Sequence, residues 1–227
     1  MLERLLTLDE QLTLALNGST SLFWDGVAVV ATATTTWLFV AAVLLYVLFH
    51  NRPVKEAVVL LLMIALCILL ADQVASGICK PYFARFRPAQ EPALMYTVDV
   101  VNGYRGGAYG FFSSHAANTF SVALFLSLVF RHAALTVALV SWSLLNCWTR
   151  AYLGVHYVGD LTVGLLWGTL VGLLVYFIYR RLHPFPPSAE HRADIQTTSG
   201  YAINDIYLLL SSLLFTYILV LLLAFIV

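Results

Sequence analysis

Two strongly apolar segments of the chain are joined by Thr149-Arg150-Ala151-Tyr152-Leu153-Gly154-Val155-His156-Tyr157-Val158-Gly159-Asp160. If the part that follows Val155 is helical, His156 and Asp160 are four residues apart and share one face of that helix. The carboxylate can then bind one imidazole nitrogen and leave the other unprotonated, as a nucleophile or a base requires. Arg150 precedes the histidine across Gly154, and its planar charged group suits a phosphate or a carboxylate. Taken alone, the spacing more often indicates a surface pair or a hydrogen-bonded core histidine.

The composition is that of an integral membrane protein. Of the 227 residues, 61% are hydrophobic and 11% are charged, and the mean hydropathy is +0.86, whereas an average soluble domain has about 25% charged residues. The net charge is zero and the basic residues are spread along the chain, so we expect no nucleic-acid partner. The three cysteines have no metal-binding spacing, and we expect no disulfide. The N-terminus lacks the basic region of a cleavable signal peptide, so we expect residues 1–227 to form one mature, integral-membrane domain.

The distribution of apolar segments predicts an all-α fold, a polytopic membrane helix bundle with about six transmembrane helices. Residues 1–20 are expected to hold an amphipathic interfacial helix, which is too short and too polar to span a bilayer. A crossing needs about 20 apolar residues, and we expect crossings near 35–49, 54–74, 116–130, 133–148, 158–179 and 207–227, the last an extra C-terminal span within 205–227. The polar region 80–115 is rich in aromatic residues, so we expect it to be packed and to contain the active site. Residues 180–204 are expected to form an exposed cytoplasmic linker.

Counting crossings places three polar groups of residues on the same side of the membrane, namely 80–87, 113–115 and 150–160. The loops of the opposite side hold six basic residues, which are Arg52, Lys55, Arg131, Arg180, Arg181 and Arg192. The first side holds the other six, but only Arg4 is counted there, because residues gathered to bind an anion report topology poorly; these are Lys80, Arg85, Arg87, Arg105 and Arg150. Basic loops are typical of the cytoplasmic side. We therefore expect the three polar groups to face outward.

Three blocks of sequence carry a family resemblance. They are Lys80-x6-Arg87-Pro88, Phe112-Ser113-Ser114-His115 and Thr149-Arg150-x5-His156-x3-Asp160. In order and spacing they resemble the signature of the type 2 phosphatidic acid phosphatase (PAP2) superfamily, which is Lys-x6-Arg-Pro, Pro-Ser-Gly-His and Ser-Arg-x5-His-x3-Asp. Phe112, Ser114 and Thr149 stand where the signature has proline, glycine and serine. The glycine matters most, because the family uses a backbone N–H there for the phosphate, and a serine offers it only with backbone angles open to a non-glycine residue.

The resemblance implies a PAP2/haloperoxidase-like core and a role for each residue of the blocks. His156 would attack phosphorus and form a phosphohistidine, with Asp160 orienting the imidazole. His115 would protonate the leaving group and later activate the hydrolytic water. The phosphoryl oxygens would be bound by Lys80, Arg87, Ser113, Ser114 and Arg150. This mechanism implies neither a metal ion nor another cofactor.

The resemblance also implies a substrate class, the phosphomonoester or diphosphate of a membrane lipid, hydrolysed at the outer face of the inner (cytoplasmic) membrane. Bacterial members act on undecaprenyl diphosphate, phosphatidylglycerol phosphate and lipid A, and we favour a polyprenyl diphosphate or a lipid A phosphate over phosphatidic acid. A second hypothesis is a non-catalytic membrane protein on the same fold, which binds phospholipid head groups or is transporter-like. A haloperoxidase is disfavoured because those enzymes are soluble. A serine protease would not need the cluster of cations.

Several ionisable residues match no position of the signature. Arg85 and Arg105 are expected to contact solvent or lipid head groups. Asp72 is expected to pair with a polar neighbour such as Gln73. His50, His132, His183 and His191 are expected to lie on the cytoplasmic side without a role in catalysis.

Overall fold

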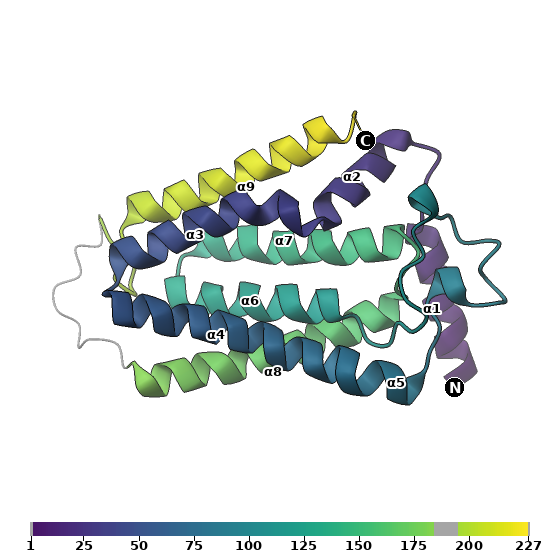
Figure 1. Ribbon diagram of the computed structural model, residues 1–227, viewed down its shortest axis with the longest axis horizontal. Coiled ribbons are helices and arrows are strands. Elements are labelled where there is room, and N and C mark those ends of the chain that lie inside the picture. The colour runs from purple at the N-terminus through teal and green to yellow at the C-terminus, as the bar shows by residue number, and fades with distance from the viewer. Residues whose placement is uncertain (1, 184–194, 227) are drawn as a thin grey trace.

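The computed structural model describes residues 2–183 and 195–226, and these residues form a bundle of helices (Figure 1). Extended pairing among them is limited to two isolated bridges, Phe86 with Tyr109 and Gln196 with Ala202. The all-α prediction is therefore confirmed. Residues 184–194 of the predicted linker, including His191 and Arg192, lie outside the described residues.

The helices have the following bounds in chain order: α1 Leu2–Leu16, α2 Leu22–Thr32, the 3-10 turn η1 Thr34–Trp37, α3 Leu38–Asn51, α4 Val54–Asp72, the π-helical turn η2 Gln73–Cys79, α5 Lys80–Phe83, the 3-10 turns η3 Pro88–Gln90 and η4 Val101–Gly103, α6 Ser114–Phe130, α7 Ala133–Tyr152, α8 Val158–Leu182 and α9 Ile203–Leu223. Each of the six expected crossings coincides with one of the long helices. Among the described residues, four helices are long and apolar enough to span a membrane, namely Thr34–Asn51, Val54–Phe83, α8 and α9. The shorter α6 and the less apolar α7 run beside them in the bundle (Figure 1).

The second crossing extends further than predicted. We expected it to end near residue 74, but the helix continues through η2 and α5 to Phe83. Pi-helical turns insert one extra residue into a helix and are frequent at functional sites. This continuation keeps Lys80 on the helix, where Asp72, Ser76 and Lys80 follow one another at intervals of four residues. Lys80 donates to Ser76 Oγ (3.1 Å) and Ser76 donates to Asp72 Oδ1 (3.1 Å), so the partner of Asp72 is Ser76 and not Gln73.

The centre of the bundle is α6, which packs against α4, α7 and α8. Gly164, Gly168 and Gly172 recur every fourth residue along α8 and face α6. A Cβ at these positions would lie 2.6, 2.7 or 2.9 Å from a backbone oxygen of α6. Small residues allow membrane helices to approach this closely. The close approach brings the start of α8 beside the start of α6, where the Ser113 N–H donates to the Asp160 carbonyl oxygen (3.1 Å).

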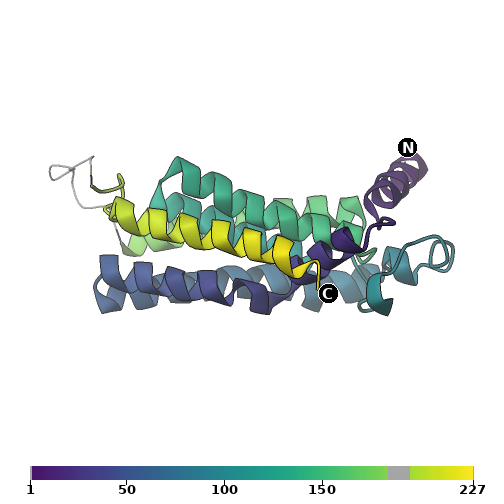
Figure 2. The same ribbon diagram turned by 90° about the horizontal axis from the view of Figure 1, so that it is seen from above.

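The loops gather at the two ends of the bundle. Helix α1, residues 84–113 and the turn between α7 and α8 lie at one end, opposite the α3–α4 and α6–α7 turns (Figures 1 and 2). The prediction that the three blocks share one end is therefore confirmed. At the opposite end Asp205 of α9 contacts Asn51 Nδ2 (2.6 Å) and His50 Nδ1 (2.8 Å), so His50 has a structural contact that holds α9 against α3.

Candidate active site

The second sequence block forms the beginning of α6. Ser113 is the N-cap, and its Oγ accepts a hydrogen bond from the Ala116 N–H (3.4 Å). Ser114 is the first residue of the helix and does not have a positive φ. Its backbone is therefore one that any L residue adopts, so the serine can present its N–H without the glycine of the signature. The first turn of a helix leaves N–H groups without intrahelical partners and favours a bound anion.

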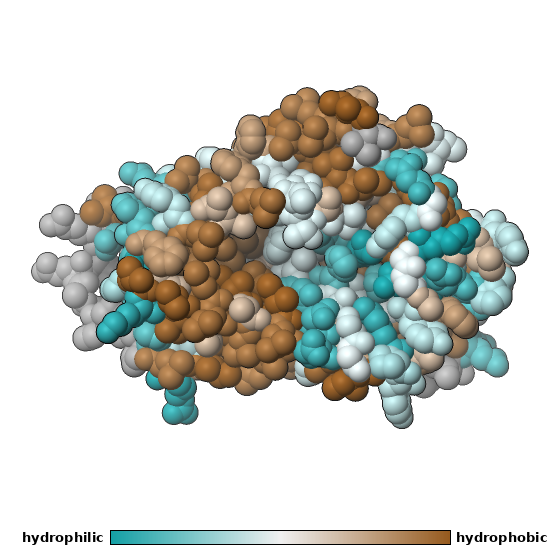
Figure 3. Space-filling model, in the orientation of Figure 1, coloured by the Kyte–Doolittle hydropathy of each residue, from teal (hydrophilic) through white to brown (hydrophobic). Residues whose placement is uncertain are grey.

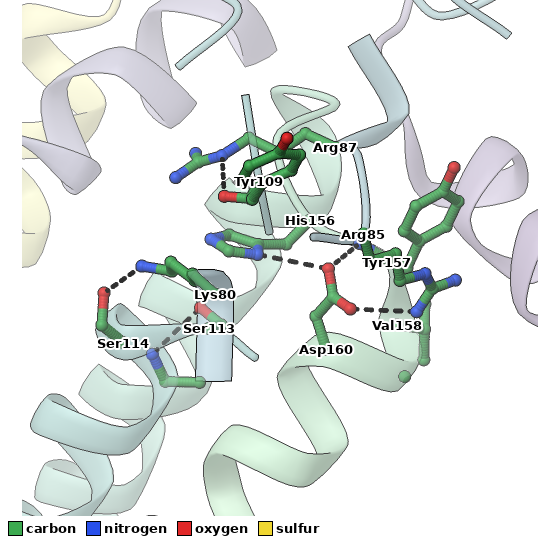
Figure 4. Close-up of polar contacts among 12 residues, drawn as sticks. Lys80, Arg85, Arg87, Tyr109, Ser113, Ser114, His156, Tyr157, Val158 and Asp160 are labelled. Carbon is green, nitrogen blue, oxygen red and sulfur yellow. Dashed lines mark hydrogen bonds and ion pairs between the residues drawn. The ribbon is translucent and has the colours of Figure 1, made fainter. Parts of the chain in front are cut away.

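Lys80 lies next to this helix start. Its Nζ donates to Ser114 Oγ (3.2 Å; Figure 4) and to Ser76 Oγ (3.1 Å), which fixes the ammonium group between η2 and the start of α6. A lysine is a compact point charge with freely rotating donors. Here two hydroxyl groups restrict it to the place where the start of α6 faces the turn before α8.

His156 and Asp160 form the predicted pair. Gly154 has a φ of +65° and ends α7, so that His156 lies in the turn before α8 and Asp160 lies in the first turn of α8. Asp160 Oδ2 is 3.4 Å from His156 Nδ1 and accepts the Tyr157 N–H (3.1 Å). The exposed fractions are 1% for His156 and 0% for Asp160. With the proton on Nδ1, Nε2 is free and points away from Asp160 to the side of Lys80 and Arg87 (Figure 4).

The surroundings keep this imidazole uncharged. Burial, followed by the positive charges of Arg87, Arg150 and Lys80, holds the pKa of His156 well below its usual value. A neutral imidazole in a positive environment has the protonation state of a nucleophile, and an arriving phosphate would reduce the repulsion among the cations.

The two arginines of the signature lie close enough to the imidazole for their charges to act on it. Arg150 is 2% exposed and donates to Thr32 Oγ1 (2.8 Å) and to Tyr104 Oη (3.1 Å), while its Nε is buried without a partner among the described residues. Arg87 donates through Nε to the Tyr109 carbonyl oxygen (3.1 Å). Burial and the charge of Arg150 lower the pKa of Arg87. Cations that repel one another in this way favour the binding of an anion between them.

Arg85 corrects an expectation. We expected it to contact solvent or lipid head groups, but its guanidinium donates to Asp160 Oδ1 (3.0 Å) and to Asp9 Oδ2 (2.8 Å). It also lies 3.9 Å from the centre of the Tyr157 ring. Arg85 is therefore the second partner of the buried Asp160 carboxylate, on the side opposite to His156 (Figure 4). The position of Arg85 two residues before Arg87 was the only signal in the sequence, and nothing in the sequence indicated Asp9.

Gly110 is another residue that the sequence did not single out. A Cβ at this position would lie 3.0 Å from Asp160 Oδ2 and 3.1 Å from Arg87 Cγ. The loop that precedes α6 thus passes so close to the His156–Asp160 pair that a side chain there would displace one of its neighbours.

His115, the second residue of α6, is exposed and lines a cavity of about 410 Å³. This cavity lies between α4, α6, α7 and η1 and reaches Asn118, Val122 and Trp142 further into the bundle. Its volume falls in the range of roughly 300–1,000 Å³ that is typical of small-molecule sites. The positive charges of Arg150, Lys80 and Arg87 act on the His115 imidazole. The cavity therefore begins at the predicted site and continues into the part of the bundle that crosses the membrane.

The surface divides in the same way. The face seen in Figure 3 is apolar over the spans and polar toward the end that holds α1 and residues 84–113. All the residues predicted for the site, together with Arg85 and Asp9, belong to that polar end. The arrangement combines a neutral imidazole, a carboxylate and several fixed cations, which together can bind a phosphate and attack it.

Comparisons with known proteins agree with this arrangement. A sequence model described as the PAP2 superfamily matches residues 56–184, which is more than half of the chain. A curated protein named lipid A 4'-phosphatase from Porphyromonas gingivalis is 39% identical over 201 residues, covering 85% of each chain. A protein of the same name from Bacteroides thetaiotaomicron is 42% identical over 183 residues, covering 80% of this chain and 81% of its own.

A solved structure has the same fold. It is the crystal structure of a transmembrane PAP2-type phosphatidylglycerolphosphate phosphatase from Bacillus subtilis, which superposes with a TM-score of 0.61. The match covers 81% of this chain and 90% of the other, at 20% sequence identity. At this identity the comparison supports the fold alone.

Proposed function

This integral-membrane chain belongs to the PAP2 superfamily, and from that premise we propose that it is a lipid A phosphatase that works through a phosphohistidine. The substrate class follows from the two curated relatives, both lipid A 4'-phosphatases of about the same length. The observation that carries the chemistry is the buried His156 imidazole, which contacts Asp160 through Nδ1 and turns Nε2 to the side of Lys80 and Arg87 (Figure 4). We favour the 4'-phosphate over the other lipid phosphates for the same reason.

The proposed reaction has two steps. In the first, His156 Nε2 forms a bond to phosphorus while the bond from phosphorus to the lipid oxygen breaks, and His115 gives its proton to that oxygen. In the second, His115 takes a proton from water, the water oxygen bonds to phosphorus, the N–P bond breaks and inorganic phosphate leaves. Lys80, Arg87, Arg150 and the N–H groups at the start of α6 stabilise the phosphoryl oxygens in both transition states. Asp160 keeps the proton on Nδ1 and stabilises the imidazole as it becomes positive.

The cavity below His115 would hold the part of the lipid that is bonded to the departing oxygen. An exit between helices lets the acyl chains remain in the bilayer while the phosphate reaches the polar end. We propose that this end faces the periplasm, in the inner membrane, because the six basic residues counted for the other side are typical of cytoplasmic loops. Helix α1 would then lie at the outer surface of the bilayer.

The test is phosphate release by the purified protein in detergent and EDTA. Lipid A, phosphatidylglycerol phosphate and undecaprenyl diphosphate should be compared as substrates, with His156→Ala as the inactive variant and His183→Ala as a matched control at the opposite end of the bundle. We expect release from lipid A in EDTA, its loss in His156→Ala, and an acid-labile phosphoenzyme in the wild type. Release that requires a divalent cation would contradict the mechanism, and preference for another lipid would contradict the substrate.

The second hypothesis, a non-catalytic protein that binds lipid head groups, makes a different prediction. A folded wild type that binds lipid A but releases no phosphate from any of the three lipids would favour it. The helical backbone of Ser114 removes the main argument for this hypothesis, which was that a serine in place of glycine would disable the phosphate site.

A further inference from the structure

Helix α1 supplies hydrogen-bond acceptors to the beginning of α8. Thr13 is 1% exposed, and its Oγ1 accepts the Val158 N–H (3.0 Å). Asp9 Oδ1 accepts the Gly159 N–H (2.6 Å). These N–H groups belong to the first turn of a helix, which usually bonds to a side chain of a nearby cap residue. Here the acceptors come from a separate helix near the N-terminus of the chain.

Asp9 has a second contact that leads to the site. Its Oδ2 lies 2.8 Å from Arg85, and the other guanidinium nitrogen of Arg85 lies 3.0 Å from Asp160 Oδ1. Asp160 in turn contacts His156 through its other oxygen. The four side chains therefore form a continuous series, Asp9 to Arg85 to Asp160 to His156, that begins on α1 and ends at the proposed nucleophile.

Because these groups are largely buried, the charged form of Asp160 depends on its contacts with the other side chains of the series. The Asp160 side chain is 0% exposed, and those of Arg85 and Asp9 are 24% and 14% exposed. A buried carboxylate is stable in its charged form only when a cation and hydrogen bonds compensate for the lost water. Arg85 supplies that cation, and Asp9 holds Arg85 on the side of Asp160 that faces away from His156. Without Asp9, Arg85 would be free to rotate toward other acceptors, such as a substrate phosphate.

The outer side of α1 has a different character. Leu5, Leu8, Leu12 and Leu16 are 57%, 50%, 46% and 45% exposed and recur at intervals of three or four residues, so they form one apolar stripe. Helix α1 lies across the end of the bundle, inclined to its long axis (Figures 1 and 2). Helix α1 therefore has two faces at this end of the bundle. Asp9 and Thr13 contact the start of α8, and the leucine stripe is exposed.

We infer that α1 is a positioning element, in which Asp9 and Thr13 fix the start of α8 and, through Arg85, hold Asp160 against His156. The expected effect on kcat rests on the proposed function. The expected effect on the first turn of α8 does not. Asp9 and Arg85 touch neither substrate nor the reacting atoms. Their effect is to keep the Asp160 carboxylate charged and aimed at Nδ1, so that the imidazole can accept positive charge during attack.

The first experiment needs no activity. Hydrogen exchange should be measured by mass spectrometry on peptides that cover residues 156–161, in wild type and in Asp9→Ala/Thr13→Val, which lacks both side-chain acceptors. Loss of the α1 acceptors should increase exchange of these amides at least about tenfold, since exchange of a structured amide follows its local opening. Glu3→Gln, an exposed acid on the same helix, is the matched control. Unchanged exchange in the double variant would overturn the inference, even if the protein proved to be inactive.

The second experiment separates positioning from general stability. Asp9→Asn should lower kcat about tenfold with KM within about twofold, and Asp9→Glu should recover most of the loss because it restores the charge. Combining Asp9→Asn with Arg85→Gln should lower kcat no further than Arg85→Gln alone, because both changes act through the same contact. Additive losses, or a fall in kcat that tracks the melting temperature, would show a merely structural role. A wild type without phosphatase activity would instead contradict the proposed function. The hydrogen-exchange experiment would still test the role of α1.

Discussion

Lys80 and Ser114 are joined by a hydrogen bond of 3.2 Å from the lysine Nζ to the serine Oγ. Ser114 occupies the position where the PAP2 signature has glycine, so the departure from the signature adds a contact to a predicted phosphate-binding residue. Because Ser114 is the first residue of α6 and has no positive φ, its backbone does not need glycine either. The serine is therefore compatible with the proposed phosphate site and helps to fix Lys80, one of the cations proposed for it.

Replacing this serine tests that conclusion. Ser114→Ala removes only the hydroxyl, and a hydrogen bond to a charged group contributes roughly 1.5–3 kcal/mol when buried. Because Lys80 keeps Ser76 as a partner, we expect the smaller effect of about a three- to tenfold rise in KM. Ser114→Gly should raise KM equally and also lower the melting temperature, since glycine weakens the first turn of a helix. A kcat/KM above that of the wild type in Ser114→Gly would show that the serine impairs the site.

Gly110 should tolerate no side chain. A Cβ in Gly110→Ala would lie 3.0 Å from Asp160 Oδ2 and 3.1 Å from Arg87 Cγ, so the loop or the carboxylate must move. Displacements of about 1 Å in a catalytic site can cost on the order of 100-fold in rate. We expect kcat to fall by about 10- to 100-fold. Gly107→Ala, in the same loop with no atom within 4 Å of the added Cβ, is the control and should retain full activity. Equal activity of the two variants would contradict this account of the loop.

The sequence predicted those parts of the site that local spacing determines. The contact of His156 with Asp160 follows from their four-residue spacing, and the six long helices follow from the apolar segments. The position of the three blocks at one end of the bundle follows from the number of helices between them. Arg85 and Asp9 could not be predicted, because their contacts join positions 76 residues apart and no pattern in either segment requires the other. The extension of the second crossing was missed because Gly77 and Pro81 usually end a helix. Here Gly77 lies within the π-helical turn η2, and Pro81 lies in the first turn of α5, where a proline is tolerated.

Stability should depend on pH through His156. The pKa of this imidazole is held below its ordinary value by burial and by Arg87, Arg150 and Lys80. Above about pH 6.5 the group is neutral in both the folded and the unfolded protein. Below that pH the unfolded chain binds a proton that the folded protein does not, so the free energy of unfolding falls by up to about 1.4 kcal/mol per pH unit. Between pH 7.5 and pH 5, the melting temperature of the wild type should fall further than that of His156→Asn. Parallel curves for the two proteins would contradict the lowered pKa.

The cavity below His115 should determine which substrates reach the site. Val122 lines it two turns below the start of α6, so Val122→Trp would fill the space proposed for the leaving lipid without touching the phosphate-binding residues. We expect kcat/KM for lipid A to fall at least about tenfold, because the lost contacts act on binding and orientation. Hydrolysis of para-nitrophenyl phosphate, which has no acyl chain, should be unchanged and would show that the variant is folded. Leu170→Trp, on the exposed side of α8, is the matched control. If Val122→Trp lowers both activities equally, the cavity is not the lipid site and the substitution acts on the fold.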